Sequence, residues 1–215
     1  DFQYNCHLTL GWGRDKYLDY GDETNQLPQF RKVGHSTSDS MMYESLGLFQ
    51  TQGEIDAWKL NQDGRSNKTL APGDIKYKDQ NDDGVLDYKD RVYMTNNSFP
   101  DLTGSFSLGC SYKGVYFSML FNGVKGYSKE ITEKYSLYNG QLPRFQQYHL
   151  TDSWSESNPD AMYPRIKFSS YSDNNRETSN FWIRKCNFIR LRSVNIGYSF
   201  PAALISKFHL STASI

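Results

Sequence analysis

Hydrophobic and polar residues alternate with a period of two along several stretches of the chain. The clearest stretch covers residues 2–12. Its even positions are apolar and its odd positions are polar or glycine: Phe2, Tyr4, Cys6, Leu8, Leu10 and Trp12 against Gln3, Asn5, His7, Thr9 and Gly11. Successive side chains of a β-strand point to opposite sides, so this pattern is typical of a strand with one apolar and one polar face. The helical period is nearly absent, and the sequence therefore predicts an all-β fold.

The same alternation predicts further strands over residues 102–112, 115–121 and 194–200, and a less regular strand over residues 41–49. Lys113-Gly114 is a two-residue turn that joins two of these strands into an antiparallel hairpin. Pro201 begins a turn after the fifth strand, and we expect a sixth strand to start at Phe208.

The connections between the predicted strands differ greatly in length. Those near residues 113–114 and 201–206 are short, whereas those at about 50–100 and 125–187 are very long. Such long connections are unusual in a compact soluble domain, and short turns at one end with long loops at the other are typical of outer-membrane barrels. Alternation alone leaves another class open, an antiparallel β-sandwich whose apolar face is its core.

An acidic loop at residues 79–90 has the oxygen spacing of a calcium site. An EF-hand loop supplies ligands from positions 1, 3, 5, 7, 9 and 12 and turns sharply at a glycine in position 6. The residues at those positions here are Asp79, Asn81, Asp83, Val85 (through its carbonyl), Asp87 and Asp90, with Gly84 at the turn. No helix is predicted on either side, so the pattern predicts a structural Ca²⁺ ion and not a calcium sensor. The alternative is a solvated acidic turn.

Composition narrows the function classes. The 215 residues carry 24 basic and 24 acidic side chains, so the net charge is zero and nothing favours a nucleic-acid partner. Mean hydropathy is −0.72. The sequence contains no run of about 18 apolar residues, so it predicts no transmembrane helix. The three cysteines match no metal or redox spacing.

Catalytic motifs are missing from the sequence. The four histidines are scattered, and there is no nucleophile elbow, zinc-protease motif or phosphate loop. We therefore expect no enzyme and name no catalytic residue. Four aromatic residues in the second long connection stand among polar residues and suit binding of a carbohydrate or peptide: Trp154, Tyr163, Tyr171 and Trp182. The alternative is that these aromatics pack the loop against its neighbours.

Five stretches in a fixed order carry a resemblance to a known family. They are residues 43–55 (YESLGLFQTQGEI), 71–92 (APGDIKYKDQNDDGVLDYKDRV), 111–115 (SYKGV), 158–165 (NPDAMYPR) and 188–201 (FIRLRSVNIGYSFP). Together they resemble the C-terminal third of SusC/RagA-type TonB-linked outer-membrane transporters, and they cover nearly the whole chain. Asp82 stands where the family's usual string has glycine, and Met41-Met42 replaces a glycine-containing segment.

The resemblance implies that residues 1–215 are the C-terminal part of a 22-stranded transmembrane β-barrel in the outer membrane, without its plug domain. The long connections at about 50–100 and 125–187 would then be extracellular loops. The parent would import oligosaccharides or peptides together with a SusD-like lipoprotein, using energy from TonB. The alternative from another class is a soluble, Ca²⁺-stabilised β-sandwich that binds glycans.

The six predicted strands run alternately down and up through the bilayer in this scheme. Residues 2–12 run down, 41–49 up, 102–112 down, 115–121 up, 194–200 down, and the strand from Phe208 onward up. Arg190 and Arg192 lie four and two positions before the lipid-facing Val194, so regular alternation would place them on the same face. We therefore expect either that they lie beyond the hydrocarbon or that a bulge resets the register.

Overall fold

The chain folds into two compact units. The computed structural model describes residues 1–131, 147–167, 174–208 and 213–215. The first unit comprises residues 1–14, 97–128 and 185–215, and the second comprises residues 15–96 and 129–184. None of the helices in the described part of the chain has the length and apolar character that crossing a bilayer requires.

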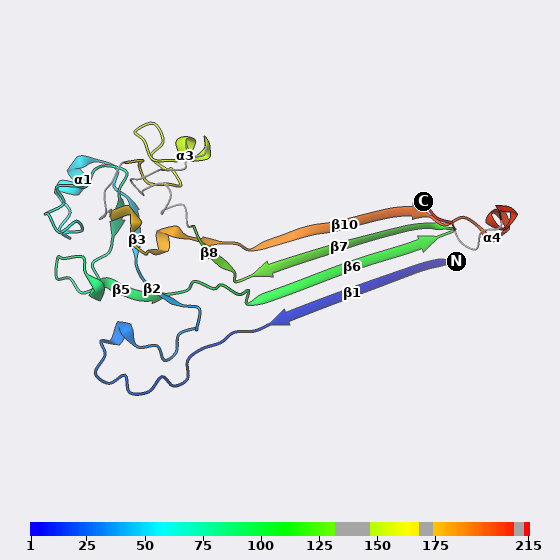
Figure 1. Cartoon of the computed structure of the whole chain (residues 1–215), viewed down its shortest axis with the longest axis horizontal. Coiled ribbons are helices and arrows are strands. Elements are labelled where there is room, and N and C mark those ends of the chain that lie inside the picture. Colours follow the sequence, from blue (N-terminus) through cyan, green and yellow to red (C-terminus); the bar gives the residue numbers. More distant parts are fainter. Residues whose placement is uncertain (132–146, 168–173, 209–212) are drawn as a thin grey trace. The chain divides into compact units, whose positions relative to one another are not determined.

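Four long antiparallel strands form the first unit, in the order β1-β6-β7-β10 (Figure 1). Each strand has 11 residues: β1 (Phe2–Trp12), β6 (Leu102–Tyr112), β7 (Val115–Lys125) and β10 (Phe188–Tyr198). The short helices α4 (Ala202–Ile205) and η5 (Ser206–Phe208) follow β10. Both chain termini lie at the end of the sheet where β6 turns into β7.

The β6–β7 hairpin is built as the sequence predicts. Tyr112 pairs with Val115 across the two-residue turn. Lys113 and Gly114 both have positive φ, at 49° and 91°. Positive φ at both central residues defines the type I′ turn, whose twist matches that of the flanking strands, and glycine adopts it without strain.

The second unit contains short elements joined by long irregular segments. Its strands and helices are η1 (Pro28–Phe30), β2 (Ser40–Tyr43), β3 (Ser45–Leu48), α1 (Gln52–Asp56), β4 (Ile75–Tyr77), η2 (Tyr88–Asp90), β5 (Arg91–Met94), α3 (Gln147–Thr151), η3 (Asn174–Arg176) and η4 (Asn180–Trp182). Strand β2 pairs with β5, and β3 pairs with β4. Strands β8 (Ser128–Glu130) and β9 (Ile183–Lys185) pair where the chain passes from one unit to the other.

An aromatic-rich core holds the second unit together. Its main cluster is Tyr43, Leu48, Leu60, Ile75, Tyr77, Tyr163 and Trp182, and a smaller cluster is Phe49, Ile55 and Leu70. Trp58 packs against both clusters. Full burial of one such side chain contributes about 1.5–3 kcal/mol, so these clusters are the main source of stability for a unit with little regular structure.

The predicted strand over residues 41–49 does not belong to the long sheet. It is divided at Glu44 into β2 and β3, which pair with β5 and β4 inside the second unit. Strand β1 therefore pairs directly with β6 and runs antiparallel to it, so the predicted common direction of these two strands is wrong. The long connections, residues 13–101 and 126–187, still leave the sheet at one end, because the hairpin turn is at the other.

The last predicted strands also differ in their limits. Strand β10 begins at Phe188, six residues before the predicted start at residue 194. The prediction starts too late because a bulge interrupts the alternation of apolar and polar residues. Phe208 lies in η5 and not in a strand, and residues 209–212 lie outside the described residues. Residues 213–215 pair antiparallel with residues 198–200, through hydrogen bonds that join Tyr198 to Ile215 and Phe200 to Ala213.

Candidate functional site: a two-faced sheet and an acidic loop

One face of the long sheet is apolar across all four strands. Its cross-strand rows include Leu8, Phe106, Phe121 and Leu191; Cys6, Leu108, Met119 and Val194; and Tyr4, Cys110, Phe117 and Ile196. Several of these side chains are open to the surroundings, with Ile196 71% and Leu8 61% exposed. Contiguous apolar surface of this kind marks a face that meets another protein or a membrane.

The opposite face is lined mainly by small polar residues. Its rows include Asn5, Gly109, Ser118 and Asn195; His7, Ser107, Leu120 and Ser193; and Thr9, Ser105, Asn122 and Arg190. The Asn195 side-chain amide donates a hydrogen bond of 3.2 Å to Ser118 Oγ. Hydroxyls, amides and glycines on one side and aliphatic and aromatic groups on the other are the pattern of a sheet between water and lipid.

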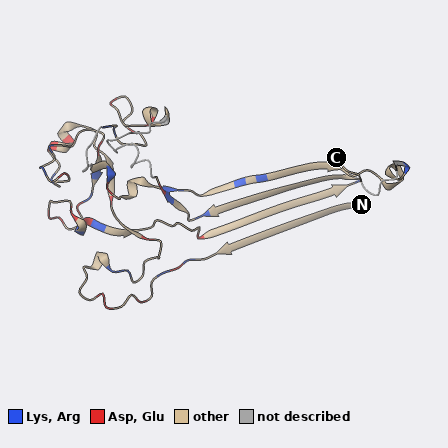
Figure 2. Cartoon of the chain, in the orientation of Figure 1, with Lys and Arg blue, Asp and Glu red and all other residues tan. Residues whose placement is uncertain are grey.

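A β-bulge at Arg192 keeps the two faces separate in β10. Leu191 pairs with Phe121 and Ser193 pairs with Leu120, so Arg192 is the extra residue. Arg190 therefore lies opposite Asn122, on the polar face. Figure 2 shows that basic residues in β10 interrupt an otherwise mostly uncharged sheet. The bulge is one of the two predicted solutions, and its effect is to remove a guanidinium from the apolar face.

The length of the strands matches a hydrocarbon layer. Eleven residues span about 35 Å along a strand, and a tilt of about 40° reduces this to about 27 Å, close to the apolar band of outer-membrane barrels. Aromatic residues stand near both ends of the apolar face. Trp12 lies at the end with the long connections, and Tyr112 and Tyr198 lie at the other end. Such aromatic girdles mark the two membrane interfaces in barrels of this type.

The acidic loop lies between β4 and β5 and is folded by its own hydrogen bonds. Asp79 Oδ2 accepts from the Gly84 N–H at 2.8 Å, and Asp83 Oδ1 accepts from the Val85 N–H at 2.9 Å. Asp90 Oδ2 accepts from the Asp87 N–H at 2.9 Å and closes a capping box at the start of η2. Gly84, at φ 78°, makes the sharp turn that the spacing predicts.

Negative charge is crowded in this loop. Asp90 is fully buried, and burial raises its pKa above the usual range, with smaller contributions from Asp79 and Asp83. A hydrogen bond from the Val85 N–H lowers the pKa of Asp83. The Asp79 Oδ1 atom is buried and accepts no hydrogen bond in the described part of the chain. A buried carboxylate oxygen without a donor is costly, and a cation would satisfy it.

The predicted ligands fit a cation in chemistry and only partly in arrangement. Oxygen is the only ligand atom that Asp79, Asn81, Asp83, Asp87 and Asp90 would supply, and hard cations such as Ca²⁺ prefer oxygen. In the residues that the structure describes, no three acidic, histidine or cysteine side chains converge into a group that could hold a metal ion. The ion would have to draw the side chains together, so Ca²⁺ binding stays a prediction.

A buried ion-pair cluster joins two of the sequence stretches that carry the family resemblance. Asp74, at 0% exposed, receives two hydrogen bonds from the Arg165 guanidinium, at 2.9 and 3.1 Å. Asn175 Nδ2 donates to Asp74 Oδ1 at 2.9 Å, and Lys167 Nζ lies 3.3 Å from the same oxygen. A buried carboxylate needs such partners, because an unpaired charge in the interior is strongly unfavourable.

The four aromatic residues predicted to bind ligand lie in different environments. Trp182 is 0% and Tyr163 is 5% exposed, and both belong to the core of the second unit. Trp154 is half-buried, covers Gly73 and donates its indole N–H to Gln50 Oε1 at 3.0 Å. Tyr171 lies outside the described residues. Burial favours the packing role for Tyr163 and Trp182, and ligand binding by this group stays a prediction.

Sequence reasoning missed the residues that organise the second unit. Asp74 meets Arg165 and Asn175 although they lie 91 and 101 positions away from it in the sequence. Gln62 belongs to the same interior. Its Oε1 accepts a hydrogen bond from the Tyr77 N–H, and its Nε2 donates one to the Ile75 carbonyl. The available signal was the joint presence of the PGD and YPR stretches, which contain the two charges of the ion pair.

Comparisons with known proteins find similar sequences among TonB-dependent receptors. A scan against models of protein families finds no match. The chain is 26% identical to TonB-dependent receptor P26 of Formosa agariphila over 94% of the chain, and 28% identical to TonB-dependent receptor P39 of the same organism over 72%. It spans 20% and 14% of the length of these two curated relatives. The relatives are named as receptors and not as enzymes.

Solved structures with a similar fold include "Structure of the RagAB peptide transporter", with a TM-score of 0.62, 16% identity and coverage of 100% of this chain and 22% of that chain. The RagAB peptide importer in its "open-open" state gives a TM-score of 0.61 at 17% identity, over 100% of this chain and 22% of that one. At this identity the likeness concerns the fold. It confirms the all-β prediction and assigns the long sheet to part of a large antiparallel barrel.

Proposed function

We propose, from the premise that the chain is a portion of a SusC/RagA-type TonB-dependent receptor, that its long sheet is part of the wall of an outer-membrane importer. The apolar face would contact lipid, and the polar face would line the interior. The observation that carries this proposal is the register of the sheet, which keeps apolar residues in line across four strands and moves Arg190 to the other face.

The cargo would be oligosaccharides or peptides, imported with a SusD-like surface lipoprotein and with energy from TonB. Support comes from the receptor names of the relatives and from the likeness to a peptide transporter. The second unit would then be formed by the extracellular loops, predicted at about 50–100 and 125–187 and seen as the connections 13–101 and 126–187.

A structural cation would stiffen the acidic loop outside the cell. Asp79, Asn81, Asp83, Asp87 and Asp90 would hold it with their side chains and Val85 with its carbonyl. Two observations support this proposal: the buried Asp79 Oδ1 accepts no hydrogen bond from the described residues, and burial raises the pKa of Asp90. Extracellular calcium sites tolerate weak binding, which suits the shorter Asp90 in place of glutamate.

The test uses the full-length receptor in its own cells. The receptor should be found in the outer membrane, should co-purify with a lipoprotein, and its deletion should abolish growth on either peptides or oligosaccharides as the nutrient. Loss of TonB should have the same effect as loss of the receptor. A receptor found in a soluble fraction, or uptake that continues without TonB, would contradict the proposal.

A further inference from the structure

We propose that the apolar face of the long sheet carries a groove for an acyl chain of a phosphorylated lipid, with the lipid phosphate bound by Lys125. The inference rests on the proposed function, because it requires this face to lie in a bilayer. It goes further by naming one place on the face and one lipid chemistry.

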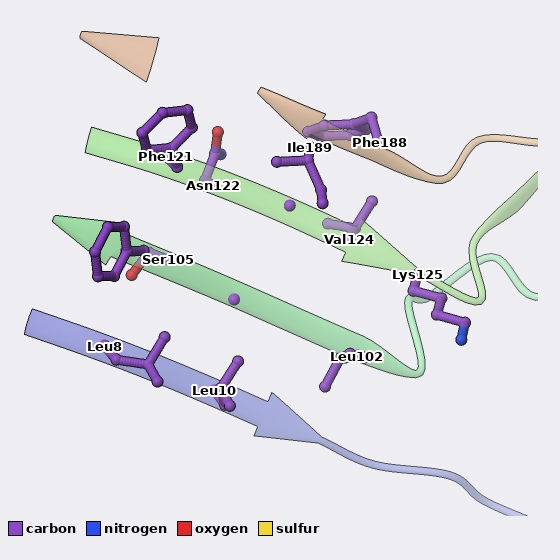
Figure 3. Close-up of a pocket in the computed structure, with 13 residues that line it drawn as sticks. Leu8, Leu10, Leu102, Ser105, Phe121, Asn122, Val124, Lys125, Phe188 and Ile189 are labelled. Atoms are coloured by element: carbon purple, nitrogen blue, oxygen red, sulfur yellow. The ribbon is translucent and has the colours of Figure 1, made fainter. Parts of the chain in front are cut away.

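Two glycines create the groove. Gly104 of β6 lies directly opposite Gly123 of β7, and the same row continues to Leu10 of β1 and Ile189 of β10. The neighbouring row is bulky, with Leu8, Phe106, Phe121 and Leu191. The cavity has a volume of about 300 Å³, and Figure 3 shows Leu8, Leu10, Phe121 and Ile189 among the side chains that line it.

Backbone conformation does not explain Gly104. Neither Gly104 nor Gly123 has a positive φ, so other residues could adopt their backbone angles. A Cβ at Gly123 would come within 2.8 Å of the Phe188 carbonyl oxygen, so close strand packing accounts for that glycine. A Cβ at Gly104 would meet only the flexible end of Leu10 at 3.0 Å and the Thr9 carbonyl oxygen at 3.5 Å. Glycine weakens a strand interior and often marks the close approach of a ligand.

A lysine stands at the end of the groove. Lys125 pairs with Leu102 in the next row, lines the same cavity and is exposed (Figure 3). No ion pair of Lys125 is present among the described residues. The nearby Asp101 carboxylate is instead bound by Arg14 at 2.9 Å. A lysine beside apolar surface can extend along it and place its ammonium at the level of the head groups.

The position along the strand determines the occupant. Lys125 and Trp12 both pair with Leu102, so the cation is in the aromatic row at one edge of the apolar band. The groove is one row further into the band. A chain in the groove would therefore connect to a head group next to Lys125. This charge complementarity favours a phosphorylated acyl lipid over a neutral one.

The experiment measures lipid binding to the full-length receptor, purified in detergent after correct insertion has been verified by heat-modifiable migration. Native mass spectrometry would follow titration with phosphorylated lipid A and with the same lipid after removal of its phosphates. Wild-type receptor should prefer the phosphorylated form. Lys125→Gln should weaken binding of that form about fivefold, the effect of one lysine near an anionic head group, and should leave binding of the dephosphorylated form unchanged.

Gly104→Leu fills the groove without a backbone clash and should weaken binding of both lipids by about tenfold or more, as expected when extra methylene groups fill an apolar pocket. Lys113→Gln, at the hairpin turn, and Cys110→Leu, on the apolar face away from the groove, are the matched controls and should bind as wild type does. Equal binding by all variants, equal affinity for both lipids, or competition by inorganic phosphate alone would overturn the proposal.

The outcome separates the two proposals. A receptor that never inserts into the outer membrane contradicts the importer itself. A receptor that inserts and supports uptake, yet binds both lipids equally in every variant, contradicts only the lipid groove.

Discussion

Arg190 lies opposite Asn122 across β7 and β10, on the polar face of the sheet. By strict alternation from Val194 it would share the apolar face. One extra residue, Arg192, changes the parity. The relationship matters because a charged side chain among lipid tails is unfavourable, whereas a guanidinium on the water-facing side is not. The bulge thus links a local backbone irregularity to the proposed position of the sheet in the membrane.

Deletion of Leu191 should impair assembly of the full-length receptor. Regular pairing of the shortened strand would then place Arg192 opposite Phe121 on the apolar face, at a cost of about 1–2 kcal/mol, between the values for the midplane and the interface. The measurement is the amount of heat-modifiable receptor in the outer membrane. Deletion of Arg192 shortens the strand equally but keeps Arg190 opposite Asn122 and Leu191 opposite Phe121, so it should assemble normally. Equal yields of the two variants would contradict a lipid-facing position for this row.

Removal of the Arg165 charge, which pairs with buried Asp74, should destabilise the second unit. Among the described residues, Arg165→Met leaves Asp74 with Lys167 as its one charged partner, and breaking a buried pair costs about 3–5 kcal/mol. Hydrogen exchange of the Ile75 amide, which donates to Asn175, is the readout. The double variant Asp74→Asn/Arg165→Met should lose less stability than the sum of the losses in the two single variants. Strict additivity would show that the two residues act independently.

Removal of divalent cations should loosen the acidic loop. Chelation of Ca²⁺ leaves the Asp79, Asp83 and Asp90 charges uncompensated, so the amides of residues 79–90 should exchange faster by about tenfold, which corresponds to about 1.4 kcal/mol. Asp79→Asn should show fast exchange with or without Ca²⁺. Asp56→Asn, on α1 outside the loop, is the control, and exchange that ignores Ca²⁺ in the wild type would refute a bound cation.

Acid should weaken the contact between Glu44 and Lys78. The hydrogen bond from Lys78, at 3.0 Å, lowers the pKa of Glu44 below its usual value of 4.5, and Gln80 adds a second hydrogen bond. A lowered pKa means that the contribution is complete above about pH 4.5 and is lost as the pH falls through the folded value. Because the pair is partly exposed, we expect about 0.5 kcal/mol.

The readout for this pair is the Lys78 amide, which donates to the Glu44 carbonyl at 2.9 Å. After correction for intrinsic exchange rates, Glu44→Gln should exchange about twofold faster than wild type at pH 7 and equally fast at low pH. A difference that persists unchanged in acid would rule out Glu44 ionisation as the cause.

The sequence predicts the long sheet well because its signals are local. Alternation in residues 2–12 and 102–112 and the turn at Lys113-Gly114 need no knowledge of distant residues. The strand over 41–49 fails for the opposite reason. Its halves are short, and their partners β5 and β4 are identified only once the second unit has folded. The start of β10 is hidden by the bulge, since one extra residue inverts the period.

The site is predicted less completely than the fold. The spacing in residues 79–90 identifies the loop and its glycine turn, yet it does not show that Asp90 is buried. Trp182 and exposed aromatics have the same local sequence signature, an aromatic residue among polar ones. The sequence does not show that polar residues around Trp182 make hydrogen bonds inside the fold. The Asp74–Arg165 pair depends on contacts between residues far apart in the chain, which no local pattern specifies.

The most direct test of the central claim is a cysteine scan along β6 in the full-length receptor in its native membrane. Spin labels at Phe106 and Leu108 should be relaxed by oxygen dissolved in lipid, and labels at Ser105 and Ser107 by a water-soluble nickel complex. A period of two over residues 105–108 is the predicted result, because this strand would separate lipid from water. Equal exposure of both sets to water would contradict a lipid-facing sheet.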